Sequence, residues 1–485
     1  MAAAQPIVLV PLCLRAWGAD EYGRWLVLTA LVSYLSMLDL GGQSYIGNLL
    51  ALNHANGKRD SFRQILSEGV SLFILIAAAG LVLLLGLLFG LMNPRVTGMG
   101  SALANSERLI ILFLGSGFLL SVPTGVYLSV YRARGLFVRG TMLGNVFRLA
   151  HLVLSVGMLT TSTSPLVYAF VLLVANVTST LVIVRDSRRT IAGCGEIRLS
   201  LAAAKRGQQY LRGALQFWLL ALANGLNQQG VLLVLGIFAS PAIVAVYATH
   251  RTAAGLVGYV GALLQAPLWP EFSKLSAQGR REDLRHVALS AIKVVMLVSG
   301  LAAVAMWVVL PSIYPLWTNK QLQLKPALFA VFLLQGVLAA GWFTSAWSLF
   351  ATNEHRMPAR WSLANAVVTI ALTLVLGPKY GVMGVALATL IGDVLCGLAV
   401  YPRLAARILG LSAWSVYQAM MLVVLLLLPL LMAVIIARHW LTGWLFVASF
   451  LVVGAAGCML AVPRGIAAQA WLNGLLRRSH EGASR

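Results

Sequence analysis

Long runs of apolar residues alternate with short polar segments along almost the whole chain. There are fourteen such runs, each of about 16 to 28 residues, against the ~20 residues that a helix needs to cross a bilayer. This pattern predicts an all-α integral membrane protein with about 14 transmembrane helices. The predicted spans cover residues 2–17, 25–50, 65–92, 108–131, 141–160, 165–184, 213–239, 244–269, 288–310, 326–350, 361–377, 382–401, 415–436 and 441–462.

The segment Arg185–Arg212 is the longest polar interruption between these runs. It holds seven Lys or Arg residues in 28 positions and contains no long apolar run. A segment this basic between membrane spans is expected to stay in the cytoplasm, because positively charged loops resist translocation. We expect a cytoplasmic linker that is either a solvated connector or a site for lipid headgroups or a partner.

The six spans before the linker and the first six after it share features at matching places. The segments 131–145 and 351–365 each contain a basic loop that leads to an Asn, and Asn176 and Asp393 lie at similar depth in the last span of each block. Chance similarity between apolar segments is the alternative to a true repeat. Six is an even number, so such blocks enter the membrane in the same direction, and parallel repeats place substrate sites between the halves. We therefore expect two parallel six-helix repeats around a central cavity, with domains 1–184, 185–212 (linker), 213–401, 402–462 (two extra helices) and 463–485 (cytoplasmic tail).

Composition and charge agree with a membrane protein. Of the 485 residues, 60% are hydrophobic and only 10% are charged, whereas soluble domains carry about 25% charged residues. The net charge of +22 arises from 36 Lys and Arg. If both ends are cytoplasmic, the cytoplasmic segments hold 25 of these residues and the opposite segments hold 8, which follows the positive-inside rule. The excess charge therefore reflects membrane topology, and we expect no nucleic acid partner.

Several kinds of chemistry lack support in the sequence. The longest outer loops, 93–107 and 311–325, are too short for an extramembrane catalytic domain, and no Walker A, GxGxxG or HExxH motif is present. The cysteines form no CxxC pair, which argues against a disulfide framework or a metal site. We expect no enzyme activity, no cofactor and no metal. The four cysteines are Cys13, Cys194, Cys396 and Cys458.

The segment Gly18–Asn48 is the most informative stretch. A Gly-Ala-Asp-Glu-Tyr-Gly turn leads into a span with Trp25 at its mouth, and the sequence Leu-Asp-Leu-Gly follows at 38–41. This pattern resembles the second span of the polysaccharide and O-antigen flippases, which belong to the superfamily of multidrug, oligosaccharidyl-lipid and polysaccharide exporters. The short first span departs from that family's pattern. Weaker similarity covers Arg132–Arg139 and Lys379–Asp393, and the layout of fourteen spans also fits.

The resemblance implies a flippase that moves a polyprenyl-diphosphate-linked oligosaccharide from the inner to the outer leaflet of the bacterial cytoplasmic (inner) membrane. Its partners would be this lipid-linked substrate, membrane lipids, and possible polysaccharide polymerases and glycosyltransferases of lipopolysaccharide and O-antigen biosynthesis. A cation-coupled multidrug extruder of the same superfamily is the first alternative. A membrane glycosyltransferase or polymerase is the second, although it would need acidic clusters or a large outer loop.

Polar groups inside the apolar runs are the candidates for contact with substrate. A glycan and a diphosphate cannot cross hydrocarbon without a polar path, and ionisable residues inside a membrane mark such paths. Aromatic faces suit sugar rings, so Trp218, Trp342 and Trp347 are further candidates, whereas interhelical hydrogen bonds are the alternative for the amides. The expected cavity residues are Asn145, Arg148, His151, Asn224, Asn227, Gln228, His250 and Arg251.

Two acidic residues lie well inside predicted spans and are candidates for ion coupling. A carboxylate in the membrane can exchange a proton, and no nucleotide site is present to supply energy. Asp393 is the better candidate because it lies about eleven residues, or ~17 Å, into its span. Asp39 precedes Gly41 and Gly42, where close helix packing favours a structural role. Either carboxylate could instead pair with Arg148 or Arg251.

Overall fold

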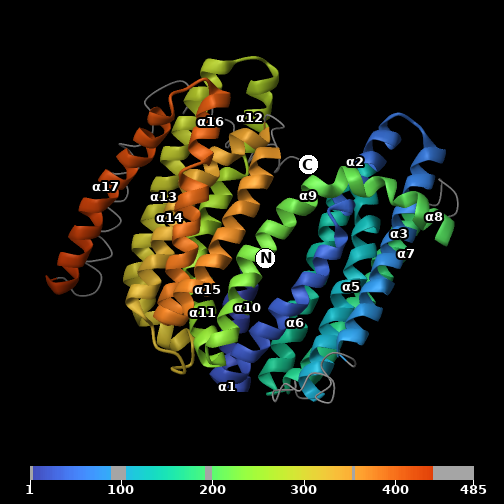
Figure 1. Cartoon of the computed structure of the whole chain (residues 1–485), viewed down its shortest axis with the longest axis horizontal. Helices are drawn as coiled ribbons and strands as arrows, with labels where there is room; N and C mark the ends of the chain where they lie inside the picture. Colours follow the sequence, from blue (N-terminus) through green and yellow to red (C-terminus); the bar gives the residue numbers. More distant parts are fainter. Residues whose placement is uncertain (1–3, 89–104, 192–198, 352–355, 441–485) are drawn as a thin grey trace, which may run out of the picture. The chain divides into compact units, whose positions relative to one another are not determined.

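The computed structural model describes residues 4–88, 105–191, 199–351 and 356–440, and these residues form helices without any strand (Figure 1). Within them, ten helical stretches are long and apolar enough to cross a membrane. The prediction of an all-helical protein with many spans is therefore confirmed. The count of 14 stays a prediction, because 441–462 lies outside the described residues and Pro241–Gln265 is not among the ten.

Two of the ten stretches, Gln5–Ala55 and Met357–Leu409, are 51 and 53 residues long and contain breaks. The first is interrupted at Gly18, with φ 79°, and the second at Gly381, with φ 58°. Glycine adopts a positive φ without the steric penalty of a Cβ atom, so it permits a sharp change of direction. Both breaks lie in the turns that the sequence predicted between consecutive spans.

The chain divides into two compact units. Unit 1 contains Met1–Ala248, Trp317–Leu322 and Thr373–Val385, and unit 2 contains Thr249–Leu316, Gln323–Leu372 and Ala386–Arg485. The domain boundaries expected from the repeat stay a prediction.

The elements up to residue 238 are α1 (Ala4–Ser33), η1 (Tyr34–Asp39), α2 (Gly42–Ala55), α3 (Arg59–Gly86), α5 (Asn105–Ala133), α6 (Phe137–Thr160), α7 (Pro165–Ile191), α8 (Leu201–Gly207), α9 (Gln209–Gly225), η4 (Leu226–Gly230) and α10 (Val231–Phe238). The later elements are α11 (Pro241–Gln265), α12 (Leu268–Ala277), α13 (Arg281–Trp317), α14 (Pro326–Ala351), α15 (Arg356–Gly392), η5 (Asp393–Leu398), α16 (Tyr401–Leu409) and α17 (Ala413–Trp440).

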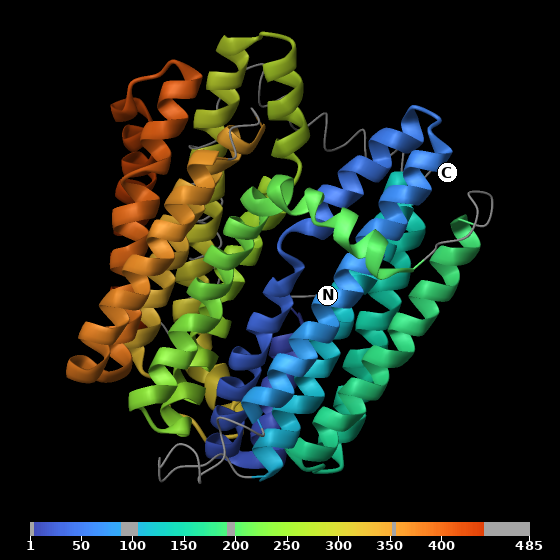
Figure 2. The same ribbon diagram turned by 45° about the vertical axis from the view of Figure 1, so that its right-hand side comes forward.

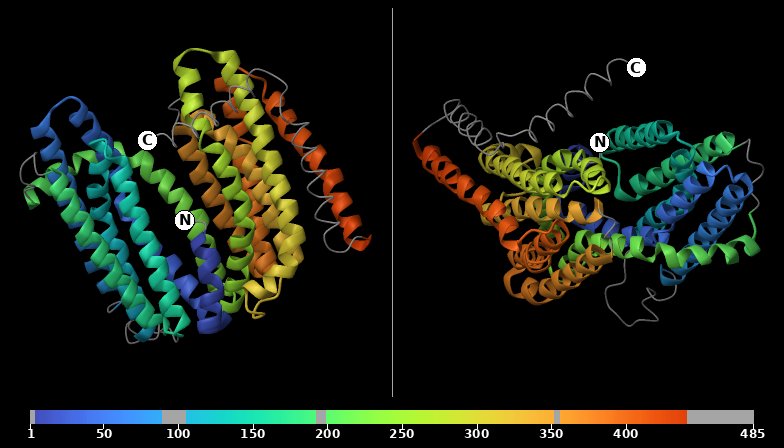
Figure 3. Two further views of the ribbon diagram at one scale, coloured as in Figure 1. Left: turned by 180° about the vertical axis from the view of Figure 1, so that it is seen from behind. Right: turned by 90° about the horizontal axis from the view of Figure 1, so that it is seen from above.

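The core of unit 1 is formed by α2, α3, α5 and α7. Figure 3 shows α5, α6 and α7 running side by side. The helix α2 approaches α3 closely at Gly42, which faces the ring of Phe73 where a Cβ atom would not fit. Burial of such side chains stabilises the bundle through close packing. The buried cluster consists of Ile46, Leu50, Phe62, Leu66, Val70, Phe73, Val122, Val126, Tyr127, Val130, Ala133 and Ile183.

The core of unit 2 is built around the long helix α13. One face of α13 packs with α12 and α14, and its neighbouring face packs with α16 and α17. Met296 lies between these layers and is 1% exposed. Small residues such as Gly300 let Leu427 of α17 approach the α13 backbone.

The linker contains a docked helix in its described part, 199–212. Ser200 caps α8 by accepting a hydrogen bond from the backbone N–H of Ala203 (3.1 Å), and α8 lies against α3 (Figure 2). The contact is centred on Glu68 of α3, which is 1% exposed. Its carboxylate accepts hydrogen bonds from Arg206 (2.8 Å) and Tyr210 (2.7 Å). This part of the linker is therefore a packed element and not a solvated connector.

Helix contacts recur at matching positions in the two units. Gly117 of α5 lies beside Asn176 of α7, so that an added Cβ would be 3.0 Å from the Asn176 Nδ2 atom. In unit 2, Gln335 of α14 donates a hydrogen bond to Asp393 of η5 (2.7 Å). The paired positions are 218 and 217 residues apart along the chain. The two contacts therefore lie at matching intervals along the chain, and the repeat itself stays a prediction.

Candidate functional site

Unit 1 contains a polar cleft, here called the arginine cleft, with a volume of about 290 Å³. Three helices form it: α2 contributes Gln43 and Ser44, α5 contributes Ser129 and Arg132, and α6 contributes Thr141 and Arg148. The side chain of Gln43 is fixed, because it packs on Gly125 and donates a hydrogen bond to the Val122 carbonyl (3.2 Å). The remaining lining residues are Gly125, Leu128, Tyr131, Phe137, Gly140 and Gly144.

The two guanidinium groups of the arginine cleft have no carboxylate partner among the described residues. Arg132 lies against the Cα atom of Gly47, and Arg148 donates from Nε to the Gly144 carbonyl in its own helix (3.3 Å). The nearby carboxylate of Asp186 is already occupied by the hydroxyl of Tyr131 (2.6 Å) and by Arg139. Arginine side chains bind phosphate groups well because their planar N–H donors match the oxygen atoms. The cleft is therefore suited to an anion.

A second cavity of unit 1, here called the amide cavity, has a volume of about 270 Å³. Its lining comes from η1 on one side and from α9 and η4 on the other, and α9 contacts η1. Asp39 provides its carboxylate, and Trp218 donates a hydrogen bond from Nε1 to the Met37 carbonyl (3.1 Å). The full lining is Ser33, Met37, Asp39, Leu40, Gly41, Trp218, Ala221, Asn224, Gly225, Gln228 and Gln229.

Both chain segments that line the amide cavity depart from α-helical geometry at the cavity. On one side the 3₁₀ turn η1 ends at Leu40, with φ 51°, and Gly41, with φ 71°. On the other side η4 is a π-helical turn. Such turns are uncommon within helices and occur frequently at functional sites. The linings of the two cavities are in contact at this point, because the backbone N–H of Gln43 donates to the Asp39 Oδ1 atom (3.1 Å).

Unit 2 places Asp393 in a network of polar side chains. Its two carboxylate oxygens accept hydrogen bonds from Gln335 (2.7 Å) and Asn365 (2.9 Å). Thr389 and Thr369 hydrogen-bond in turn to these two amides, and Arg251 interacts favourably with the carboxylate through its charge. Asp393 begins η5, a second π-helical turn.

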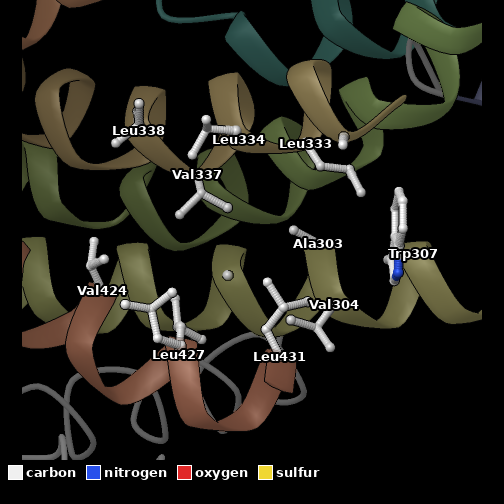
Figure 4. A pocket seen from close by; sticks show the side chains of 13 residues that line it. Ala303, Val304, Trp307, Leu333, Leu334, Val337, Leu338, Val424, Leu427 and Leu431 are labelled. Atoms are coloured by element: carbon white, nitrogen blue, oxygen red, sulfur yellow. The ribbon is translucent and has the colours of Figure 1, made fainter. Parts of the chain in front are cut away.

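A third cavity, also of about 270 Å³, has an apolar lining. Figure 4 shows side chains of α13, α14 and α17 around it, among them Val304, Leu333 and Leu427. Trp307 supplies the only side-chain hydrogen-bond donor among its lining residues. This groove can hold hydrocarbon but offers nothing for a sugar or a phosphate.

Comparison with known proteins identifies the fold. No protein-family model and no curated protein matches the chain. Among solved structures, the chain is similar to lipid II flippase MurJ in an inward closed conformation, with a TM-score of 0.69, 13% identity, and coverage of 95% of this chain and 96% of that one. It is also similar to an inward-facing multidrug resistance MATE family transporter of the MOP superfamily, with a TM-score of 0.67, 15% identity, and coverage of 84% and 94%. A third similar structure is the MATE multidrug transporter DinF-BH, with a TM-score of 0.55, 15% identity, and coverage of 84% and 91%. The chain has the fold of the MOP superfamily.

This MOP fold brings only some of the expected cavity residues together. Arg148 lies in the arginine cleft, whereas Asn224 and Gln228 lie in the amide cavity with Asp39. Asn227 belongs to the same π turn and is half-buried. Asn145 and His151 do not line either of these cavities; both are half-buried, and the His151 Nε2 atom makes no hydrogen bond to a described residue.

His250 and Arg251 belong to unit 2 of the MOP fold. His250 is fully buried, its Nε2 atom accepts a hydrogen bond from the backbone N–H of Lys325 (2.8 Å), and its Nδ1 atom lies 3.2 Å from the Tyr314 hydroxyl. With both ring nitrogens engaged, a structural role is favoured for His250. The carboxylate that Arg251 acts on is Asp393.

Several residues of these sites were missed by sequence reasoning. The sequence assigns Arg132 to a basic cytoplasmic loop, and neither Arg132 nor Gln43 is among the expected cavity residues. Gln335 had a usable signal, since it is a lone amide in an otherwise apolar span. The approach of Arg132 to Arg148 had no sequence signal, because it depends on how α5 and α6 pack.

Proposed function

We propose that this chain is an exporter that moves a polyprenyl-diphosphate-linked oligosaccharide across the bacterial cytoplasmic membrane for the synthesis of a surface polysaccharide such as O-antigen. The observation that carries the proposal is the arginine cleft, where Arg132 and Arg148 lie without a described carboxylate partner. Two unpaired cations beside hydroxyl and amide groups suit a diphosphate. The MOP fold supports transport as the general activity.

The charge distribution supports a position of this cleft near the cytoplasmic side. Arg132 begins the loop 132–140, which the positive-inside rule assigns to the cytoplasm. A lipid-linked glycan made in the cytoplasm would meet the protein on that side. Glycosyltransferases and a polysaccharide polymerase would then act before and after transport as functional partners.

A multidrug extruder is the second candidate function. The amide cavity favours it in one respect, because Asp39 and Trp218 are groups that a flat organic cation could contact. The arginine cleft argues against it, since two unpaired guanidinium groups repel a cationic drug. Neither candidate involves catalysis by the protein.

Transport of a fluorescent polyprenyl-diphosphate-linked sugar in proteoliposomes tests the proposal. The double variant Arg132→Gln, Arg148→Gln should lose transport by about tenfold or more, because charge-assisted hydrogen bonds to phosphate are removed. Arg134→Gln is the matched control, since Arg134 lies in the same loop but does not line the cleft. Full transport by the double variant, or export of cationic dyes but not of lipid-linked sugar by the unchanged protein, would contradict the proposal.

A further inference from the structure

The amide cavity contains the chemistry that a sugar ring requires. Sugar hydroxyls both donate and accept hydrogen bonds, and side-chain amides offer both functions while a carboxylate accepts two or more. Asn224, Gln228 and Gln229 supply amides, and Asp39 supplies the carboxylate. Asn224 is exposed to the cavity side of its helix and makes no hydrogen bond to a described residue. These groups surround one cavity although they come from two distant segments.

Trp218 adds an aromatic surface to this polar set. The apolar C–H face of a pyranose packs well on an aromatic ring, and a buried indole usually needs a partner for its N–H group. The Nε1 atom of Trp218 donates to the Met37 carbonyl (3.1 Å), so the ring is held in one orientation at the cavity. A fixed aromatic plane with amides beside it can orient a ring as well as bind it.

The π-helical turn η4 explains how neighbouring residues serve the same cavity. In a regular α-helix, consecutive side chains point about 100° apart. Gln228 and Gln229 both line the amide cavity, and both lie within the wider turn of η4. Across the cavity, the left-handed backbone at Leu40 and Gly41 ends η1 beside Asp39. Both the π-helical turn and the left-handed backbone occur at the cavity, and unusual backbone conformations of this kind cluster at binding sites.

The two cavities of unit 1 differ in the sign of their charged side chains. The amide cavity has Asp39 as its charged group and would repel a phosphate, whereas the arginine cleft attracts one. The two linings are in contact, because Gln43 of the arginine cleft donates a backbone hydrogen bond to Asp39 Oδ1 of the amide cavity. A sugar joined directly to a diphosphate could therefore place its two parts in the two adjoining sites.

We propose that the amide cavity is a carbohydrate subsite that holds the sugar nearest the diphosphate, with Asp39, Asn224 and Gln228 as hydrogen-bonding groups and Trp218 as the stacking surface. This inference rests on the proposed function and deepens it. It gives Asp39 a role in substrate recognition and leaves Asp393 as the candidate for ion coupling.

Binding to the purified full-length protein tests the subsite with defined probes. The probes are polyprenyl diphosphate and the same lipid carrying one glucose, galactose, N-acetylglucosamine or N-acetylgalactosamine. The unchanged protein should bind at least one sugar-bearing probe about tenfold more tightly than the bare lipid, because a site built for hydroxyl groups discriminates strongly against their absence. Gln228→Leu should abolish this preference and leave the affinity for the bare lipid within about twofold.

Two further variants keep the test decisive if Gln228→Leu folds poorly. Ala221→Phe keeps every polar group but fills the amide cavity, and it should also abolish the preference. Gln278→Leu, at the exposed end of α12, is the matched control and should retain it. If the unchanged protein prefers no sugar-bearing probe, or if the preference survives in both cavity variants, the subsite is refuted. If the unchanged protein does not bind bare polyprenyl diphosphate, the proposed function itself fails.

Discussion

At the scale of single residues, the two intramembrane acids have different surroundings. Asp39 accepts a backbone hydrogen bond from Gln43 at the start of α2 and also lines the amide cavity. Asp393 is held by two side-chain amides, Gln335 and Asn365. The predicted repeat matches Asp393 with Asn176, which lies beside Gly117, so under that prediction only one of the two matching positions carries a carboxylate. This asymmetry suits a single coupling site in the second block.

Replacing Asp393 tests this role. Asp393→Asn should reduce the gradient-stimulated part of transport by about tenfold or more, because an amide cannot take up and release a proton and intramembrane carboxylates serve such relays. Transport into proteoliposomes as the pH gradient is varied measures this component. Asp20→Asn, at an exposed position, is the control. Full, gradient-dependent transport by Asp393→Asn would exclude Asp393 as the coupling residue.

At the scale of elements, the described part of the linker docks on α3 through one buried carboxylate. Glu68 of α3 accepts hydrogen bonds from four side chains: Gln64, Arg206, Gln209 and Tyr210. Burial and the contact with Glu68 raise the pKa of Tyr210, so its hydroxyl keeps the proton that it donates. The helix α9, which carries Asn224 of the amide cavity and leads into η4, begins directly at this contact.

Removal of the Glu68 carboxylate should loosen this element. Glu68→Ala should lower the free energy of unfolding by about 1–3 kcal/mol, since it leaves several donors without their acceptor. It should also speed proteolysis within 192–212. Glu282→Ala is the control, because Glu282 forms an exposed ion pair with Arg285 that contributes little. Thermal unfolding in detergent and limited proteolysis measure both effects, and equal behaviour of the two variants would refute the role of Glu68.

At the scale of the whole molecule, the distribution of charge predicts the topology. Three predicted spans separate the turn before α3 from the turn after α6. Each span crosses the membrane once, so the two turns should face opposite sides. The first is basic and the second contains no charged residue between 160 and 165. The positive-inside rule therefore assigns the first to the cytoplasm.

Cysteine labelling in a cysteine-free background tests this assignment. Asn56→Cys and Thr161→Cys replace exposed residues in the two turns. A membrane-impermeant thiol reagent should label Thr161→Cys in intact cells with a permeable outer envelope, and Asn56→Cys only after the cytoplasmic membrane is opened. The reverse pattern would mean that the chain is inserted with the opposite orientation.

The sequence by itself determined the class of the protein. Apolar runs of membrane length, the sparse charges and their bias to one side were sufficient to predict a multi-span helical protein, because the bilayer admits only backbone whose hydrogen bonds are satisfied internally. The turns that contain Gly18 and Gly381 were also predicted, because short segments separate the apolar runs there. These features depend on local composition, which a sequence shows directly.

The tertiary structure decided which polar residues meet. Arg132 and Arg148 share a cleft because α5 and α6 pack together, and Asp39 meets Gln228 because α9 passes beside η1. It also decided that His250 has both ring nitrogens engaged within unit 2, which no pattern of neighbours along the chain revealed. Such contacts depend on the packing of segments that are distant in sequence. They also depend on local departures from the α-helix, such as the π-helical turn η4 that lines the amide cavity. Periodicity along one segment carries no information about them.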